Sequence, residues 1–168
     1  KNRIKEFEKY DSLAILLLLQ VLCETKSKTV EELFISQLEP ILDSLESEHP
    51  AIAKFAFSLV VKISMLFPIF NYDSNVLRVM HAAQTQSLGN PHVVSNAIDC
   101  VIQVYRKADL SNAELFDSIT PMMMGLCTNV LQREDAATEN LATKTYMILE
   151  EIIVRSPENK FEAAKSIF

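Results

Sequence analysis

Histidine and cysteine are the residues of this sequence that could ligate a metal or act as a nucleophile. The histidines are His49, His81 and His92. A zinc site needs several converging ligands, often two histidines four residues apart on one helix with an acidic residue beside them. These histidines stand far apart in the sequence, so we expect surface or helix-capping roles for them, no metal ligands and no cofactor.

The cysteines lie inside apolar segments. Cys23, Cys100 and Cys127 are odd in number and have no CxxC spacing, so the sequence predicts neither a disulfide framework nor a zinc site. A thiol in an apolar helix packs as a small hydrophobic side chain with a raised pKa. Asp99 precedes Cys100, but the sequence places no histidine beside them to activate the thiol. We therefore predict that the chain is not an enzyme and that it occupies a reducing, intracellular compartment.

Composition and charge narrow the class of partner. Of the 168 residues 49% are hydrophobic, which is ample for a buried core. The net charge is -6, and the basic residues are scattered, so no polybasic stretch is available for nucleic-acid phosphates. The most apolar run, residues 13–23, is too short to span a membrane. We expect a protein or peptide partner, no direct nucleic acid, no membrane span and a cytoplasmic location, with shuttling to the nucleus left open.

The elements that must position any site are predicted to be helices joined by short connections. Thr29 and Ser111 each begin a capping box with the Glu three residues later, in which the side chains satisfy free N–H groups of the first turn. Asn90 and Ser156 each precede a proline at the first helical position, and Gly89 marks a helix end. The predicted helices span residues 11–24, 29–46, 50–66, 74–88, 91–107, 111–132, 135–154 and 157–168, with a short one at 2–8.

Alternate helices repeat at a constant offset. Residues 32–34 recur as residues 114–116 at an offset of 82, which is twice the offset of 41 found between other helices. A two-helix period of about 41 to 45 residues is typical of HEAT or armadillo arrays. The positions matched at an offset of 41 are Pro50 with Pro91, Ile52 with Val93, Ala56 with Ala97 and Val60 with Val101, and a further shift of 45 reaches Thr138, Ala142 and Tyr146.

Residues 38–56 resemble the helix A, turn, helix B pattern of the HEAT-repeat family. Pro40 stands at the family's helix A proline and Lys54 near its basic residue in helix B, whereas Glu48 replaces the Asp of the turn. The resemblance implies an all-α fold, a right-handed α-solenoid of about three and a half antiparallel helix pairs. Within that family the acidic balance looks most like the importin-β group of nuclear transport receptors, and large trafficking scaffolds share the same pattern.

The resemblance also implies how the chain is divided. We expect a single helical-repeat segment over residues 1–168, with repeat units at 29–66, 74–107 and 111–154 and partial repeats at both ends. The sequence begins at Lys1 and ends on an apolar pair, so we expect a piece excised from a longer solenoid.

Two local features have alternative interpretations. Met122–Met124, followed by Gly125, could line an adaptable hydrophobic groove or fill the space beside Pro121. The aromatic loop at residues 67–72 could contact a partner or cap the hydrophobic seam between repeats. Packing is the simpler interpretation of both.

The predicted function is that of a non-catalytic scaffold that presents a concave helical surface to a protein or peptide, with nuclear transport as a candidate setting. The alternative is a regulatory or homo-oligomerising helical domain of a large trafficking or signalling protein. An acidic edge of Glu31, Asp43 and Glu46 could attract a basic peptide. The expected polar contacts to the partner come from the second helices of the repeats: Lys54, Lys62, Asn96, Asp99, Gln103 and Asn140.

Overall fold

The computed structural model describes residues 2–25, 27–68, 73–134 and 138–156, and this part of the chain consists of helices without a strand. The expected all-α class is therefore confirmed. The elements in chain order are α1 (Asn2–Leu22), a 3₁₀ turn (Cys23–Thr25), α2 (Lys28–Ser36), α3 (Leu38–Ser44), α4 (Pro50–Leu66), α5 (Asp73–Gln86), α6 (Pro91–Lys107), α7 (Ala113–Leu131) and α8 (Thr138–Arg155).

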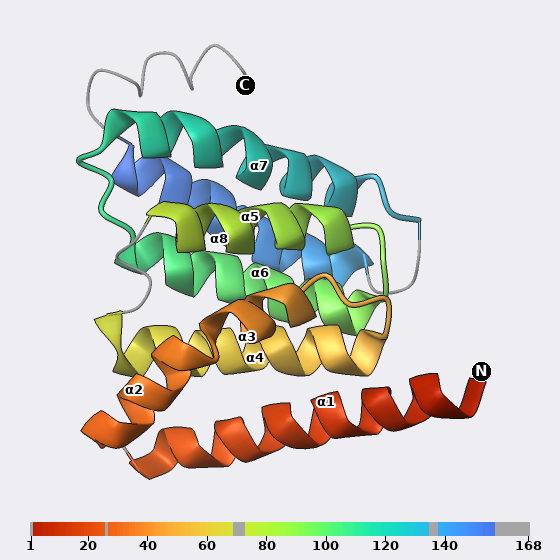
Figure 1. Cartoon of the computed structure of the whole chain (residues 1–168). Helices are drawn as coiled ribbons and strands as arrows, with labels where there is room; N and C mark the ends of the chain where they lie inside the picture. The colour runs from red at the N-terminus through yellow and green to blue at the C-terminus, as the bar shows by residue number, and fades with distance from the viewer. Residues whose placement is uncertain (1, 26, 69–72, 135–137, 157–168) are drawn as a thin grey trace.

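The helices form two layers that alternate along the chain (Figure 1). In the layer at the back, α4 packs against α6 and α6 against α8, while α1 lies against the other side of α4. In the layer at the front, α2 and α3 are followed by α5 and then α7. The layers meet where α3 contacts α4, α5 contacts α6, and α7 contacts α8. We call α2, α3, α5 and α7 the first layer and α1, α4, α6 and α8 the second layer.

The hydrophobic core runs between the layers as one continuous cluster from Leu16 to Ile152. All of the apolar pairs matched at an offset of 41, from Ile52 with Val93 to Val60 with Val101, are buried in it. The third copy of that pattern differs, because Tyr146 is 63% exposed whereas Val101 is fully buried. The difference follows from position: α6 lies between α4 and α8, whereas among the described helices α8 has a neighbour in its layer only at α6.

Two helices begin and end where the sequence predicts. Helices α4 and α6 span Pro50–Leu66 and Pro91–Lys107, and each has proline at its first position, where the missing N–H has no helical partner to lose. Asn90 caps α6 by accepting a hydrogen bond from the backbone N–H of His92 at 3.0 Å. Proline therefore fixes these boundaries more firmly than hydrophobic periodicity does.

The predicted helix at 29–46 is wrong in two respects. It begins at Lys28, because the Ser27 hydroxyl, not that of Thr29, accepts from the backbone N–H of Val30 at 3.2 Å. It is also divided at Gln37, whose φ and ψ are -102° and 6°. Pro40 explains the break, since it has no N–H to donate to the carbonyl four residues earlier. Pro121, in contrast, lies inside an uninterrupted α7.

Other boundaries shift by a few residues. Asn112, not Ser111, caps α7, because its side-chain oxygen accepts from the backbone N–H of Glu114 at 3.0 Å. The helix expected at 74–88 spans Asp73–Gln86, and Gly89 donates its N–H to the Gln86 carbonyl at 2.8 Å. The predicted helices 2–8 and 11–24 are a single helix, α1. The helix predicted at 157–168 and the start of the one at 135–154 lie outside the described residues.

Side chains from one helix pair cap the helix ends of the preceding pair. Gln86, at the end of α5, donates from Nε2 to the carbonyls of Leu45 and Ser47, both at 3.2 Å. Just after α7, Arg133 donates from one guanidinium nitrogen to the Ser87 and Gly89 carbonyls, at 3.1 and 3.0 Å. Arg155 in α8 donates to the Tyr105 and Ala108 carbonyls at the end of α6. These carbonyls lie at helix ends or just beyond them, where the helix supplies few donors, so the contacts fix successive pairs in register.

Candidate interaction surface

The six polar residues predicted to contact a partner all lie on the second layer, and three of them already contact a neighbouring helix. Lys62 pairs with Glu24 at 3.2 Å, and Asn96 donates to the backbone carbonyl of Lys54 at 3.3 Å. Asp99 accepts from Lys144 at 2.5 Å. Part of the predicted set of partner-binding residues therefore forms hydrogen bonds and ion pairs between neighbouring helices. The side chains of Lys54 and Asn140 are exposed, and that of Gln103 is half-buried.

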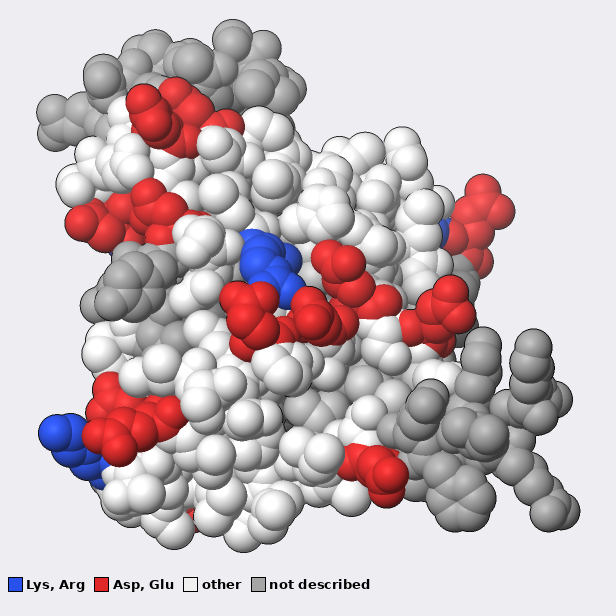
Figure 2. Space-filling view, in the orientation of Figure 1, with Lys and Arg blue, Asp and Glu red and all other residues white. Residues whose placement is uncertain are grey.

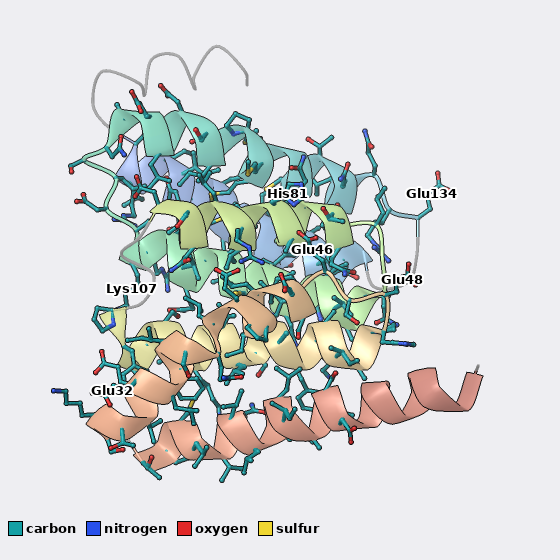
Figure 3. The ribbon with its side chains drawn as sticks, in the orientation of Figure 1. Glu32, Glu46, Glu48, His81, Lys107 and Glu134 are labelled. Carbon is teal, nitrogen blue, oxygen red and sulfur yellow. The ribbon has the colours of Figure 1, made fainter. Side chains whose placement is uncertain are left out.

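The proposed acidic edge is spread over α2, the end of α3 and the connection that follows. Two of its three members contact α5. Asp43 accepts from Arg78 at 2.6 Å, and Glu46 lies 3.1 Å from Nδ1 of His81 (Figure 3). Arg78 also pairs with Glu39. These carboxylates therefore serve in part to tie the first helix pair to the next, and Glu31 on α2 lies apart from them.

Charge is divided unequally between the layers. Asp and Glu side chains gather in several groups on the face formed by the first layer, with few Lys or Arg among them (Figure 2). On the second layer acidic and basic side chains are more evenly mixed, as in the pairs Lys62 with Glu24 and Lys144 with Asp99. The acidic residues of the first layer and its connections are Glu31, Glu32, Glu39, Asp43, Glu46, Glu48, Asp73, Asp109, Glu114, Asp117 and Glu134, against Lys28, Arg78 and Arg133.

The cysteines are core residues, as the sequence predicts. Cys23, Cys100 and Cys127 are buried, and burial raises the pKa of each thiol, to about 12 for Cys127. A buried thiol with a raised pKa is a poor nucleophile at neutral pH because little thiolate forms. Among the described residues, no group of three or more His, Cys, Asp or Glu side chains could hold a metal ion.

The methionine run packs against the core. Met123 is buried, and Met122 and Met124 are partly buried against the same cluster. These contacts favour space filling beside Pro121 over an open groove. In the aromatic loop, Phe67 is buried with its ring 5.8 Å from that of Phe34, which caps the seam between α2 and α4. Residues 69–72 of the loop lie outside the described residues.

Two apolar surfaces stand out at the sides of the second layer. On α1, the side chains of Ile15, Leu18 and Val21 are 54, 59 and 67% exposed. On α8, a shallow groove is lined by Tyr146, Leu149, Glu150, Ile153 and Val154. Contiguous exposed apolar side chains of this kind mark contact surfaces more often than isolated ones do.

Sequence reasoning missed the second apolar face of α8 and the capping arginines. The face could have been found, because helix α8 carries apolar residues on two opposite sides, with Leu141 and Ile148 on one and Tyr146 and Ile153 on the other. The roles of Arg133 and Arg155 could not, since their partners are backbone carbonyls of another helix pair.

None of the described helices is both long and apolar enough to cross a membrane. Comparison with protein-family models, curated proteins and solved structures found no match to this chain.

Proposed function

We propose that the chain is a segment of a HEAT- or armadillo-type right-handed α-solenoid that acts as a non-catalytic scaffold for a protein or peptide partner. The observation that carries this proposal is the stacking of alternate helices in two layers, tied pair to pair by capping side chains. Such a stack presents a preorganised surface, so a partner can bind without the cost of ordering the scaffold. A setting in nuclear transport or trafficking rests on the sequence resemblance alone.

The second layer is the better candidate for the binding face. Three of its helices, α4, α6 and α8, lie side by side and offer exposed polar side chains such as Lys54 and Asn140. Some of its polar residues are held in place by their contacts between helices, as Asp99 is by Lys144. Preorganised polar groups of this kind cost less entropy on binding than mobile ones.

The test compares two variants of the full chain with equal numbers of charge reversals. The second-layer variant carries Lys54→Glu and Lys107→Glu, and the control carries Glu32→Lys and Glu48→Lys on the first layer. All four side chains are exposed, and Figure 3 labels Lys107, Glu32 and Glu48. Partners recovered from cell extract are identified, and the affinity of one purified partner is measured. We expect the second-layer variant to bind about tenfold more weakly, a loss of about 1.4 kcal/mol, and the control to bind normally. Absence of saturable binding, or equal loss in both variants, would contradict the proposal.

The exposed stripe on α1 favours the second candidate function, self-association as part of a larger regulatory or signalling protein. Ile15, Leu18 and Val21 recur at three-residue spacing, which suits pairing with another helix. Sedimentation measured over a range of protein concentrations tests this function, with Leu18→Glu as the disrupting variant. A mass that stays monomeric at every concentration would rule it out.

A further inference from the structure

A groove runs between α1 and the divided first-layer helix formed by α2 and α3. Ile15, Leu16 and Leu19 line it on the side of α1, and Gln37 and Ile41 line it on the other side. Leu16, Leu19 and Ile41 are buried and lie at its floor, whereas Ile15 is 54% exposed at its rim. The side-chain amide of Gln37 is half-buried and makes no capping hydrogen bond to α3. The groove is thus apolar at its base, with one uncharged polar group beside it.

The α1 wall repeats a part of α4 that is covered. At the offset of 41 found between other helices, Ile15 matches Ala56 and Leu19 matches Val60. Ala56 and Val60 are fully buried, and α4 has α3 beside it in the first layer. Among the described residues α1 has no first-layer helix of its own, and Ile15 is exposed. The groove therefore lies where the pattern of the stack puts a first-layer helix.

The α3 wall leads to the same place. At the offset of 41, Gln37 matches Arg78, and Pro40, which also lines the groove, matches His81. Arg78 and His81 are the residues of α5 that contact carboxylates of α3 and of the connection after it. Gln37 and Pro40 thus stand at positions that, one pair later, face the preceding first-layer helix.

Helix α5 shows what kind of helix such a place holds. It packs against α6 and α7 together, with Val76, Val79, Met80 and Ala83 buried at spacings of three and four. An amphipathic helix with one apolar stripe has this pattern. The residues of α1 that line the groove span positions 12–19, which is about 11 Å or two helical turns. An occupant therefore needs an apolar stripe of at least two turns.

The charges beside the groove favour a basic helix. Asp11 is exposed and lies one turn before Ile15 on the same side of α1. On the other side, Glu39 and Asp43 share a single cation, Arg78. None of the described residues that line the groove is Lys or Arg. Lysine or arginine on the flanks of the occupant would be attracted to this excess of carboxylates.

A second copy of the chain supplies no suitable helix. Its first-layer helices α5 and α7 bury their apolar stripes in their own stack. Its α1 exposes Leu18 and Val21, but Asp11 and Glu24 on the same helix would bring acidic side chains to the acidic surroundings of the groove. Like charges brought together at an apolar interface are unfavourable. The occupant that fits is a helix of a different protein.

We propose that the groove between α1 and α2–α3 binds a basic amphipathic helix of a protein partner, which lies beside α1 as α3 lies beside α4. Apolar side chains of the partner cover Ile15 and Leu19, and its basic flanks lie near Asp11 and Glu39. This site goes beyond the proposed scaffold function, because it is separate from the second-layer face. Its test changes none of the residues used to test that face, so either proposal can fail alone.

The test measures binding of a fluorescein-labelled peptide to the full chain by fluorescence anisotropy. The peptide has about four helical turns, with leucines at spacings of three and four and lysines elsewhere. Ile15→Lys blocks the groove. Leu18→Lys is the matched control, because both residues lie on α1 with exposures of 54 and 59%, both variants gain the same charge, and Leu18 does not line the groove. We expect saturable binding whose Kd rises about tenfold or more in Ile15→Lys and less than about threefold in Leu18→Lys, while circular dichroism shows that both variants stay folded.

Two further peptides test the chemistry of the occupant. A peptide with the same composition but no apolar stripe should bind at least about tenfold more weakly, and so should one with glutamate in place of each lysine. Equal binding of either peptide would overturn the corresponding part of the proposal. Absence of saturable binding, or an unchanged Kd in Ile15→Lys, would overturn the site. An equal rise of Kd in Ile15→Lys and Leu18→Lys would also overturn it, because general charge or the outward face of α1 would then account for binding.

Discussion

At the scale of single residues, Tyr105 and Arg155 form a contact with opposed energetic effects. Tyr105 is fully buried, and its hydroxyl has no hydrogen-bond partner among the described residues. Arg155 stacks over the Tyr105 ring at 5.4 Å from its centroid and donates to two carbonyls at the end of α6. The ring therefore contributes packing and a cation–π contact, whereas the hydroxyl contributes a desolvation penalty.

Tyr105→Phe should accordingly leave the fold intact and stabilise it. Removing a buried, unpaired hydroxyl recovers about 1 kcal/mol, since the aromatic packing and the contact with Arg155 remain. The measurement is urea unfolding followed by circular dichroism, with Tyr146→Phe as the control at an exposed tyrosine. A loss of stability in Tyr105→Phe alone would show that the hydroxyl has a partner.

Arg155→Ala should destabilise the chain by about 1–3 kcal/mol, because it removes the donor to the buried Ala108 carbonyl and one of the two donors to the Tyr105 carbonyl. Arg155→Lys should recover less than half of that loss, since an ammonium cannot reach two carbonyls and stack on the ring together. Lys107→Ala, at an exposed basic residue of α6 itself, serves as the control. Equal stability of the Arg155→Ala variant and the native chain in urea would contradict the capping role.

The buried thiols predict how stability depends on pH. Burial raises the pKa of Cys23 and Cys100 above 9.0 and that of Cys127 to about 12, so the folded chain keeps protons that the unfolded chain loses. Stability from these groups is complete below the pKa of the unfolded thiols, about 8.5, and is lost as pH rises through the folded values. Thermal unfolding at pH 7 and at pH 10 should show this loss, and Cys127→Ala should reduce its size. An unchanged pH dependence in that variant would contradict the assignment.

At the scale of elements, two prolines with similar sequence positions have different effects. Pro40 lies three residues beyond a break in the first-layer helix, whereas Pro121 lies within a continuous α7. The sequence places both inside helices, and only the packing decides which helix stays whole. Gly125, four residues after Pro121, faces α5, the neighbour of α7 in the first layer. A Cβ added at this position would overlap the amide end of the Gln84 side chain.

Gly125→Ala tests how tightly α5 and α7 pack. Alanine is preferred to glycine inside a helix by about 0.8–1.0 kcal/mol, and the obstructing group is the end of a flexible side chain. We expect a net change smaller than about 1 kcal/mol for Gly125→Ala and a loss of about 1–3 kcal/mol for Gly125→Leu, measured by urea unfolding. The variant that combines Gly125→Ala with Gln84→Ala should have a higher free energy of unfolding than the changes measured in the two single variants predict when added together. A large loss in Gly125→Ala that Gln84→Ala does not relieve would place backbone, not Gln84, at the contact.

At the scale of the whole molecule, the sequence predicts the helices and much of the core but not the surfaces. Periodicity and proline caps locate α4 and α6 fully, and the offset of 41 identifies residues that are buried. Contacts of side chains with a different pair are not visible in a sequence. Thus Asp43 and Asp99, predicted as partner contacts, are found paired with Arg78 and Lys144. Surface roles depend on which helices become neighbours, and that is decided by packing.

The capping and ion-pair contacts between successive helix pairs join residues 35 to 50 positions apart. Every loop closed during folding is therefore of similar, moderate length, and its entropic cost is similar. Folding can then begin at any pair and spread to its neighbours, as in quasi-one-dimensional proteins. Native-state hydrogen exchange should show amides of the central α6 as the slowest, with protection falling toward α1 and α8. Uniform protection from α1 to α8 would instead indicate a single cooperative unit, in which case a partner bound at one side would stabilise the far side equally.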